Sequence, residues 1–419
     1  MGCLMNDFDR TPHVLVSGAG IAGLALALQL VRSGIRTTVV ERAAAPRAGG
    51  QAVDLRGASR EVAERMGIMP GVDRYRVHEE GMSYVDGEGK VFGRMSMADF
   101  DGEGAVAEIE IARGDLAEVL LDALRTAADV APGLLDLRFG DRLTALTQDA
   151  TGVDVEFEHA EPDRVDVVVG ADGVHSLTRR LAFGPDEQFA TYLGGYMAFF
   201  TMLTPADLEE NWFALRFVPG ATFGIRPDLD PTTSKAILTF RMDRDPSLRG
   251  DRAAQEALIR ERIAGAGWHA PAVLEALGAA SDLYFDELVR IDVPDVTNGR
   301  VVLLGDAASC GSPMTGQGTA TALIGAYLLA ARIAATPGDA PGALRRYTDD
   351  IAPFAEKGKE IPGGGIKRMV PATRFEAAVS RAMTRVMFSK AMLPLVRRMF
   401  SGGETLPLPE VAVPVVPGR

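Results

Sequence analysis

Three glycines and one carboxylate near the start of the chain have the spacing of a site for a phosphate-bearing ligand. Gly18, Gly20 and Gly23 follow a short apolar run, and Glu41 stands 18 residues after the last of them. Gly18 allows a sharp turn, Gly20 lets a pyrophosphate approach the backbone, and Gly23 lets a helix pack closely. The glycine pattern by itself is weak, because a glycine turn that binds nothing can share it.

The surrounding elements make the pattern specific. The sequence predicts a strand over residues 14–16, a helix from Ile21 and Ala22 to residue 34, and a strand over residues 37–40 that ends at Glu41 and Arg42. The helix start directs partial positive charge and free N–H groups at phosphates. A carboxylate at Glu41 accepts hydrogen bonds from ribose hydroxyls and disfavours a 2′-phosphate. The expected ligand is therefore FAD or NAD rather than NADP.

A second region of the same kind lies near the other end of the chain. A buried strand over residues 300–304 ends in Gly305 and Asp306, and a glycine-rich turn then opens a long apolar helix to about residue 335. The residues of this turn that we expect at the ligand are Pro313, Gly316, Gln317 and Gly318. We therefore expect one extended ligand to be held from both ends of the chain.

Arg113 is the third element that can reach this ligand. It stands at the start of a helix predicted over residues 113–124, where a guanidinium can bind a pyrophosphate with two hydrogen bonds. The alternative is an exposed arginine on a first helical turn.

Composition and charge exclude several other classes. The chain has 419 residues, 47% of them hydrophobic, and a net charge of −13. The negative charge argues against a nucleic-acid partner. Two cysteines provide no disulfide framework, the five histidines lack ligand spacing, and no metal site is expected. Since neither a signal peptide nor a membrane-spanning run is recognisable, the expected compartment is the cytoplasm, without stable membrane insertion.

The ordered motifs resemble those of the single-component FAD-dependent monooxygenases of the para-hydroxybenzoate hydroxylase class. These are the first glycine motif with Glu41 and Arg42, a motif that begins Asp172-Gly173 and continues to Ser176 and Arg179, and the Gly305-Asp306 motif. The match covers about residues 12–345. Residues 49–55 and Arg113 are similar in particular to those of the tetracycline-inactivating monooxygenases.

The resemblance implies specific roles and a reaction. FAD is held non-covalently, with Glu41 on the adenosine ribose, Arg113 on the pyrophosphate and Asp306 on the ribityl chain. NADPH or NADH reduces the flavin, and oxygen then passes from a flavin C4a-hydroperoxide to an aromatic or polyketide-like substrate. No protein side chain is assigned as catalytic. The remaining implied cofactor contacts are Asp54, Asp172 near the NAD(P)H path, and Arg47 in a mobile flavin loop.

Two departures from the family pattern leave alternatives open. Ser309 stands where the family usually has His, and Ala320 where it often has Asn. A flavin reductase or dehydrogenase that transfers no oxygen would keep the same motifs. A flavin-empty ligand-binding protein would result if the site were degenerate. Cys310 beside the turn invites a covalent or redox role, but a small buried filler is the favoured interpretation.

We therefore predict an α/β fold with α+β elements. A Rossmann-like FAD-binding domain comprises residues 12–78, 101–182 and 296–345, and a β-sheet substrate domain with one helix, at about residues 252–264, is inserted as residues 79–100 and 183–295. The substrate should be a small aromatic molecule lying between the two, with O2 as the other reactant and the protein a monomer or homodimer. The pocket candidates, each of which could equally be core, are Met197, Phe199, Phe213, Phe217 and Phe223.

The C-terminal region has its own pattern. Residues 346–400 are predicted to be helical and residues 401–419 extended. Between residues 366 and 400 apolar side chains recur at helical spacing, and eight Lys and Arg accompany Glu376. Such a basic amphipathic helix can lie on an anionic membrane or a partner. We expect it instead to pack across the two domains, because the rest of the chain is acidic.

Overall fold

The structure, a computed structural model, describes residues 11–47, 49–100, 109–361, 364–389, 391–392, 394–396 and 406–411. One body is built on a six-stranded sheet, with β18 antiparallel to β19 and the other neighbours parallel. In sheet order its strands are β18 (Thr297–Asn298), β19 (Val301–Leu303), β12 (Val167–Gly170), β1 (His13–Ser17), β2 (Arg36–Glu41) and β8 (Leu135–Phe139). The central strands β1, β12 and β19 are rich in Val and Leu and fully buried, because both faces of the sheet are covered there.

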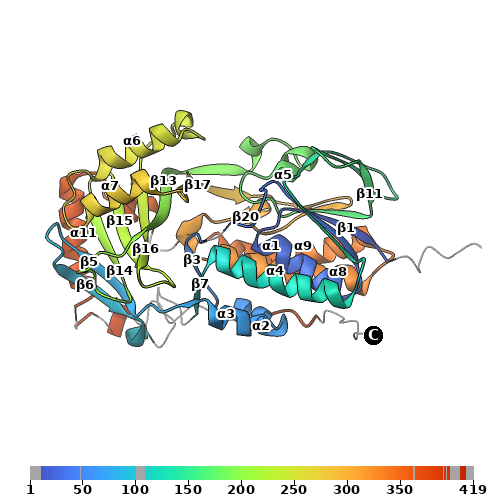
Figure 1. The fold of residues 1–419 in the computed structure, drawn as a ribbon, viewed down its shortest axis with the longest axis horizontal. Helices are drawn as coiled ribbons and strands as arrows, with labels where there is room; N and C mark the ends of the chain where they lie inside the picture. The colour runs from blue at the N-terminus through green and yellow to red at the C-terminus, as the bar shows by residue number, and fades with distance from the viewer. Residues whose placement is uncertain are drawn as a thin grey trace, which may run out of the picture.

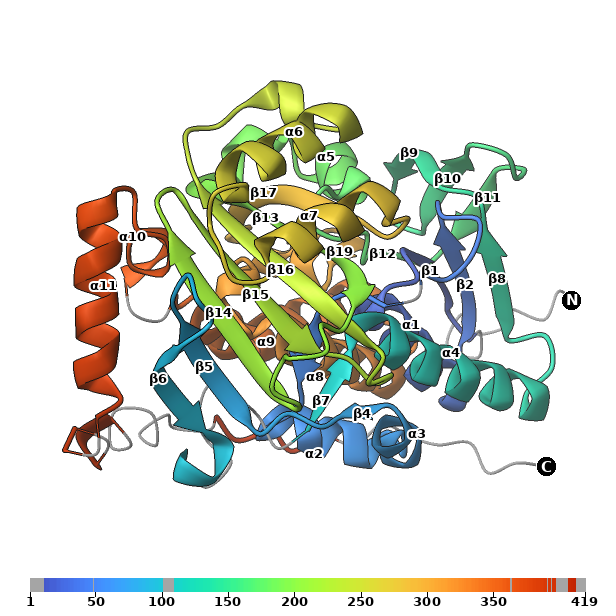
Figure 2. The ribbon, with the colours of Figure 1, turned by 60° about the vertical axis from the view of Figure 1, so that its left-hand side comes forward.

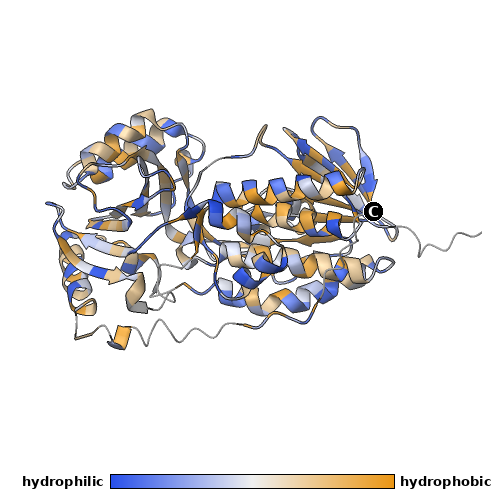
Figure 3. Cartoon of the chain, turned by 60° about the horizontal axis from the view of Figure 1, so that its bottom comes forward, coloured by the Kyte–Doolittle hydropathy of each residue, from blue (hydrophilic) through white to orange (hydrophobic). Residues whose placement is uncertain are grey.

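Helices cover this sheet and carry most of its apolar contacts. The central ones are α1 (Ile21–Arg32), α4 (Arg113–Val130), α8 (Gly318–Ala335) and α9 (Ala340–Gly358), with α2 (Ala58–Arg65), α3 (Met69–Arg74) and α5 (Leu177–Ala182) at the edges. Helix α8 packs between α1 and α9. It is the one helix of the described chain long and apolar enough to cross a membrane, and 72% of it is buried inside the fold. Hydrophobic residues gather where these helices meet the sheet (Figure 3).

Two three-stranded sheets complete this body. The first, β11-β10-β9, is antiparallel and consists of β9 (Leu143–Gln148), β10 (Val153–Phe157) and β11 (Asp163–Val165). The second, β3-β7-β4, consists of β3 (Ala52–Asp54), β4 (Arg76–Val77) and β7 (Glu110–Ala112). Because β7 leads directly into α4, this second sheet connects the loop around residues 49–54 to the start of that helix.

The other body is an eight-stranded sheet, antiparallel except where β14 pairs with β5. In sheet order its strands are β20 (Ser309–Cys310), β17 (Tyr284–Asp292), β13 (Ala190–Leu203), β16 (Thr233–Arg241), β15 (Ala221–Pro227), β14 (Trp212–Val218), β5 (Gly81–Val85) and β6 (Val91–Ser96). The long strands β13 and β17 run from this sheet toward the first body (Figure 1). Strand β20 belongs to the second glycine-rich region, so that region joins the two bodies.

The two faces of the large sheet have different environments. One face packs under α6 (Arg252–Ile263) and α7 (Ala270–Ala279) and forms a separate hydrophobic core. The prediction of a single helix in this region is therefore wrong, because residues 270–279 form a second one. The opposite face carries Met197, Phe199 and Tyr284, which cluster with Met314 of the second glycine-rich turn.

The C-terminal region differs from the prediction in two ways. The expected helix is interrupted into α10 (Ile366–Met369) and α11 (Arg374–Met387), because Pro371 cannot continue a helix and the preceding Val370 is extended. Helix α11 lies on β6 and β14 at the far edge of the large sheet (Figure 2). Its buried residues are Ala377 and Thr384, so packing across both bodies through its apolar side chains is wrong. Residues 390, 393 and 397–400 lie outside the described chain.

The final described segment packs on the first body, and the extended conformation predicted for the tail stays a prediction. Residues 406–411 form no helix or strand, and Leu406, Leu408 and Val411 pack against the core of the first body. The Tyr327 hydroxyl of α8 donates to the Val411 carbonyl at 3.3 Å. The other residues of the predicted tail lie outside the described chain.

Candidate functional site

The turn from β1 into α1 requires two of its three glycines for steric reasons. Gly18 has φ +110°, and a Cβ added there would lie 2.4 Å from the Ala171 carbonyl oxygen. A Cβ at Gly23 would lie 1.9 Å from the Gly18 carbonyl oxygen. At Gly20 the nearest atom to an added Cβ is Nη2 of Arg113, at 3.9 Å. Gly20 thus keeps open the space between the turn and a guanidinium.

The start of α1 supplies hydrogen-bond donors to this space. The first helical bond runs from the Leu24 N–H to the Gly20 carbonyl at 2.9 Å, so the N–H groups of residues 21–23 precede it. Glu41 lies beside them at the end of β2. Its carboxylate accepts from the N–H groups of Ala19 (3.0 Å) and Ala43 (2.9 Å). An anion-attracting helix start and an adjacent carboxylate therefore occupy the positions predicted for them.

Arg113 closes the opposite side of the same space. Its side chain is exposed, and Nη2 points toward Gly20. Its backbone N–H donates to the Gln51 carbonyl at 3.0 Å, and the Gly114 N–H donates to the Gly49 carbonyl at 2.7 Å. These bonds fix the loop around residues 49–51 against the start of α4. Because the guanidinium points toward Gly20, we favour a role for Arg113 in binding the ligand over that of an exposed arginine on a first helical turn.

The second glycine-rich region comes to the same place from the other end of the chain. A Cβ at Gly305 would lie 3.0 Å from Cβ of Ala22, which brings β19 and its short helix η5 (Gly305–Ala307) against α1. A Cβ at Gly318 would lie 3.4 Å from Oδ1 of Asp306, so this carboxylate stands at the N-terminus of α8. Burial raises the pKa of Asp306, while the charge of Arg113 opposes the shift.

The turn between them is conformationally constrained. Ser312 has φ +76°, which is uncommon for a residue with a side chain, and Gly316 has φ +66°. A short helix η6 (Pro313–Thr315) lies between them. The first bond of α8 runs from the Thr321 N–H to the Gln317 carbonyl at 3.0 Å. The N–H groups of residues 318–320 therefore lie ahead of that bond, next to Asp306.

Cys310 and Ser309 lie in β20, beside this turn. Cys310 is buried, and the Ser312 N–H donates to its Sγ at 3.4 Å. Burial raises the pKa of the Cys310 thiol, and the nearby Asp306 adds to the shift. A buried thiol with a raised pKa is a poor nucleophile, which agrees with the filler interpretation. Ser309 pairs with Asp292 in the strand register.

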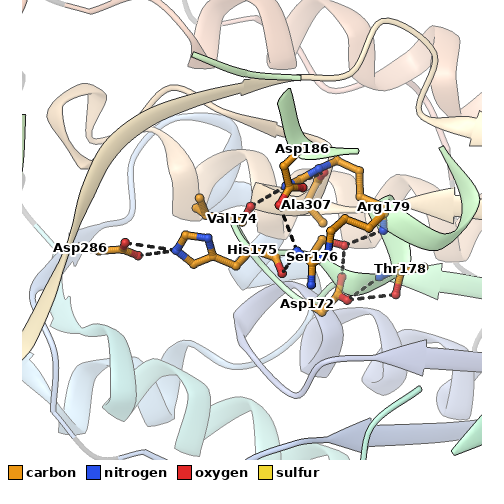
Figure 4. A network of polar contacts seen from close by, with 10 residues as sticks. Asp172, Val174, His175, Ser176, Thr178, Arg179, Asp186, Asp286 and Ala307 are labelled. Atoms are coloured by element: carbon orange, nitrogen blue, oxygen red, sulfur yellow. Dashed lines mark hydrogen bonds and ion pairs between the residues drawn. The ribbon is translucent and has the colours of Figure 1, made fainter. Parts of the chain in front are cut away.

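The Asp172-Gly173 motif forms a polar network that reaches Ala307 of the second glycine-rich region (Figure 4). Asp172 accepts from the Ser176 hydroxyl and from the N–H and hydroxyl of Thr178, at 2.9 and 3.0 Å. Arg179 is fully buried and donates to the carbonyls of Ala307 (3.0 Å) and Val174 (2.7 Å) and to Asp186. The carboxylate of Asp172 thus organises the start of α5, and its predicted place near the NAD(P)H path stays a prediction.

His175 of this motif makes a contact between the two bodies. Nε2 of His175 lies 2.9 Å from Oδ2 of Asp286 on β17, and the Tyr284 hydroxyl donates to the same oxygen at 3.3 Å. The Tyr284 ring stacks on Phe199 with centroids 4.3 Å apart. Burial raises the pKa of Tyr284, Asp286 adds to the shift, and Arg113 opposes it. These rings therefore lie where the large sheet meets the space between Arg113 and Asp306, since the charges of both residues act on Tyr284.

Comparison with known proteins identifies the family. A model of the FAD binding domain family matches residues 11–360. The chain is 35% identical over 353 residues to a flavin-dependent monooxygenase from an unknown prokaryotic organism, a match that covers 83% of this chain and 87% of the other. The chain belongs to this family of FAD-dependent monooxygenases.

Other members of the family agree in length and fold. An FAD-dependent monooxygenase of Sarocladium schorii is 32% identical over 379 residues, covering 85% of this chain and 88% of the relative. The crystal structure of tetracycline destructase Tet(55) superposes with a TM-score of 0.75 at 29% identity, covering 96% of this chain and 99% of that one. The FAD-dependent family therefore accounts for both bodies of this protein, including the large sheet.

With the family known, the substrate-pocket candidates can be placed on the large sheet. Met197 and Phe199 lie on the face toward the glycine-rich turn. Phe213 lies under Arg226, whose guanidinium carbon is 5.4 Å from the ring centroid. Phe217 stacks on Tyr84, with centroids 5.3 Å apart, beneath the end of α11. Phe223 is not part of this face, because it is fully buried in the opposite core beneath α6 and α7.

The loop predicted to contact the flavin carries several charges. Asp54 pairs with Arg56, and Arg47 is exposed. A Cβ added at Gly49 would lie 3.4 Å from Nζ of Lys235, a buried residue of β16. Lys235 in turn binds Asp228 at 2.9 Å. Sequence reasoning missed Lys235, Tyr284 and the His175–Asp286 pair, because these side chains come together only through the pairing of distant strands.

Among the described residues, no group of three or more His, Cys, Asp or Glu side chains could hold a metal ion.

Proposed function

We propose that this monooxygenase uses NAD(P)H and dioxygen to oxygenate an aromatic or polyketide-like small molecule. The observation that carries the proposal is the stacked pair Phe199 and Tyr284, which faces the space between Arg113 and Asp306 from the large sheet. An aromatic wall favours a flat, apolar substrate. The structural similarity to a tetracycline destructase supports a multi-ring substrate.

The residues around the glycine turns fit FAD. Gly20 leaves room for a pyrophosphate beside Arg113, Glu41 can accept from ribose hydroxyls, and Asp306 can accept from the ribityl chain. When bound, FAD supplies the electron transfer and the activation of oxygen. The start of α8, with Gly316, Gln317 and Gly318, would stabilise negative charge at the edge of the flavin ring.

A hollow beside His175 of the Asp172-Gly173 motif is our candidate approach for NAD(P)H. Its volume is about 260 Å³, and its lining includes Arg42, His175 and Arg249 together with Asp286 and Glu287. The two guanidiniums of Arg42 and Arg249 suit the phosphates of a nicotinamide dinucleotide, whereas His175 is already paired with Asp286. The predicted contact of Arg47 with NAD(P)H remains part of this proposal.

The test is a panel of aromatic and polyketide compounds assayed for NADPH and NADH consumption in labelled dioxygen. We expect one compound to accelerate consumption and to gain one labelled oxygen atom, with the second atom appearing in water. Accelerated flavin reduction without labelled product would favour the reductase alternative and contradict the proposal.

A variant at Tyr284 tests whether the aromatic wall holds the substrate. Tyr284→Ala should retain FAD but consume NADPH with little labelled product, because the substrate is no longer held against Phe199. Phe223→Leu, on the opposite face of the sheet, is the matched control and should keep the wild-type ratio of product to NADPH.

A further inference from the structure

Helix α11 turns its apolar side chains away from the protein. Phe375 is 77% exposed, Met383 64%, Val386 61% and Val379 39%. At 3.6 residues per turn these four positions form one row along the helix. The residues buried against β6 and β14 are instead Ala377 and Thr384, on the other side. The helix is therefore anchored by small side chains and presents its large ones to solvent.

Positive charge borders this row. Arg374, Arg381 and Arg385 are all exposed and recur at spacings of seven and four residues, which places them in a second row that lies between the apolar row and the buried side of the helix. The one carboxylate of the helix, Glu376, is already paired with Arg241 of β16 at 3.1 Å. No other carboxylate of the helix accompanies these arginines, although the charge of Arg381 also acts on Asp86, just after β5, and contributes to the lowered pKa of that carboxyl.

The rest of the chain is acidic. Residues 366–400 hold eight Lys and Arg against Glu376, in a protein whose net charge is −13. Such an asymmetric charge distribution orients a molecule in an electric field, with its basic end toward a negative surface. At the edge of the large sheet, α11 is placed to be that end (Figure 2).

We propose that α11 docks this protein on an anionic lipid bilayer, with Phe375, Val379, Met383 and Val386 in the interfacial layer and the three arginines at the headgroups. An exposed apolar row with a basic edge is the pattern of helices that lie in the plane of a membrane interface. This is peripheral attachment and requires no spanning segment. A second copy of the chain is disfavoured as the occupant, because antiparallel packing of two such helices would bring the arginine rows together.

The test is sedimentation of the full-length protein with vesicles of phosphatidylcholine alone or mixed with phosphatidylglycerol. We expect binding to the mixed vesicles, and weakening by salt because the headgroup attraction is screened. Phe375→Glu/Met383→Glu should lower the partition coefficient about tenfold or more, because it places charge in the inserted row. Arg374→Gln/Arg381→Gln/Arg385→Gln should remove the preference for phosphatidylglycerol.

Leu203→Glu/Leu229→Glu is the matched control, because these leucines are 77% and 41% exposed at the end of β13 and in the loop after β15. It should bind vesicles like the wild type, and all variants should keep the wild-type melting temperature and bound flavin. The proposal would be overturned if the wild type did not sediment with the mixed vesicles, or if Phe375→Glu/Met383→Glu sedimented with them as well as the wild type does. A wild-type dimer in sedimentation velocity that this variant dissociates would also overturn the proposal.

Discussion

Arg226 binds two buried acidic side chains, Glu79 and Glu110, and we expect this cluster to stabilise the fold. Its Nε donates to Glu79 at 2.7 Å and its Nη2 donates to Glu110, and both carboxylates have side chains only 1% exposed. Burial raises the pKa of Glu110 to about 9; Arg226 opposes the shift, whereas Glu79 and Asp54 add to it. Burial thus favours the protonated form of the Glu110 carboxyl in the folded protein.

This protonation predicts a pH dependence of stability. The pKa of Glu110 in the folded state lies above its ordinary value of 4.5, so the folded state holds a proton that the unfolded state releases. The free energy of unfolding should consequently fall as pH rises from about 5 to about 9. Glu110→Gln should flatten this slope in urea unfolding followed at several pH values. An unchanged slope in the variant would show that another group is responsible.

The same cluster shows what the sequence could not reveal at this scale. Glu110 and Arg226 are 116 residues apart, and Glu79 and Arg226 are 147 apart. No local sequence pattern relates these three residues. They come together only because the fold places β7, β15 and the segment before β5 side by side. Gly18, Gly23 and Glu41 were predictable, since their roles depend on one contiguous strand, turn, helix and strand.

At the scale of elements, the β1–α1 turn depends on close backbone approach. Gly23→Ala should distort the turn, because its Cβ would lie 1.9 Å from a backbone oxygen that cannot move independently. Overpacking of this kind costs about 1–3 kcal/mol, and FAD binding should weaken with it. Thermal unfolding and flavin content of the purified variant measure both effects.

Gly265→Ala is the matched control for that substitution. A Cβ at Gly265 meets nothing within 4 Å, and its φ lies outside the left-handed region. It should therefore leave stability and flavin content within error of the wild type. If both glycine variants behaved alike, the steric account of the turn would fail.

Elements with a strong local signal were predicted, and those fixed by tertiary contacts were not. The α1, α4 and α8 helices begin after strands and glycine turns that mark their starts. Helix α7 was missed because residues 270–279 were judged only as part of a β-rich region. The orientation of α11 was wrong because helical spacing identifies an apolar face but does not say which face meets the protein.

At the scale of the whole molecule, Arg226 connects the two bodies. It lies on β15 of the large sheet, whereas Glu110 lies on β7 of the FAD-binding body. Arg226→Ala should destabilise the protein by about 3–5 kcal/mol, because it removes the guanidinium that pairs with the buried Glu79 carboxylate and donates to Glu110. Denaturant unfolding gives this difference directly.

Arg94→Ala provides the comparison for Arg226. Arg94 pairs with Glu209 on the surface, and both side chains are more than 40% exposed. Its removal should cost at most about 1 kcal/mol for the ion pair and about 0.5–1 kcal/mol for its contact with the Trp212 ring, still less than the loss at Arg226. Equal losses for the two arginines would mean that burial between the bodies does not determine the effect.

We infer that one FAD molecule is held from both ends of the chain, with Asp306 as its contact in the second glycine-rich region. The measurement is calorimetric titration of FAD into the flavin-free wild type, Asp306→Ala and the remote control Asp350→Ala, whose residue pairs with Arg332 on α8. Loss of a charge-assisted hydrogen bond is worth about 1.5–3 kcal/mol, so Asp306→Ala should bind FAD about ten- to a hundredfold more weakly. Asp350→Ala should bind like the wild type. Wild-type affinity in Asp306→Ala would contradict the assignment of the site.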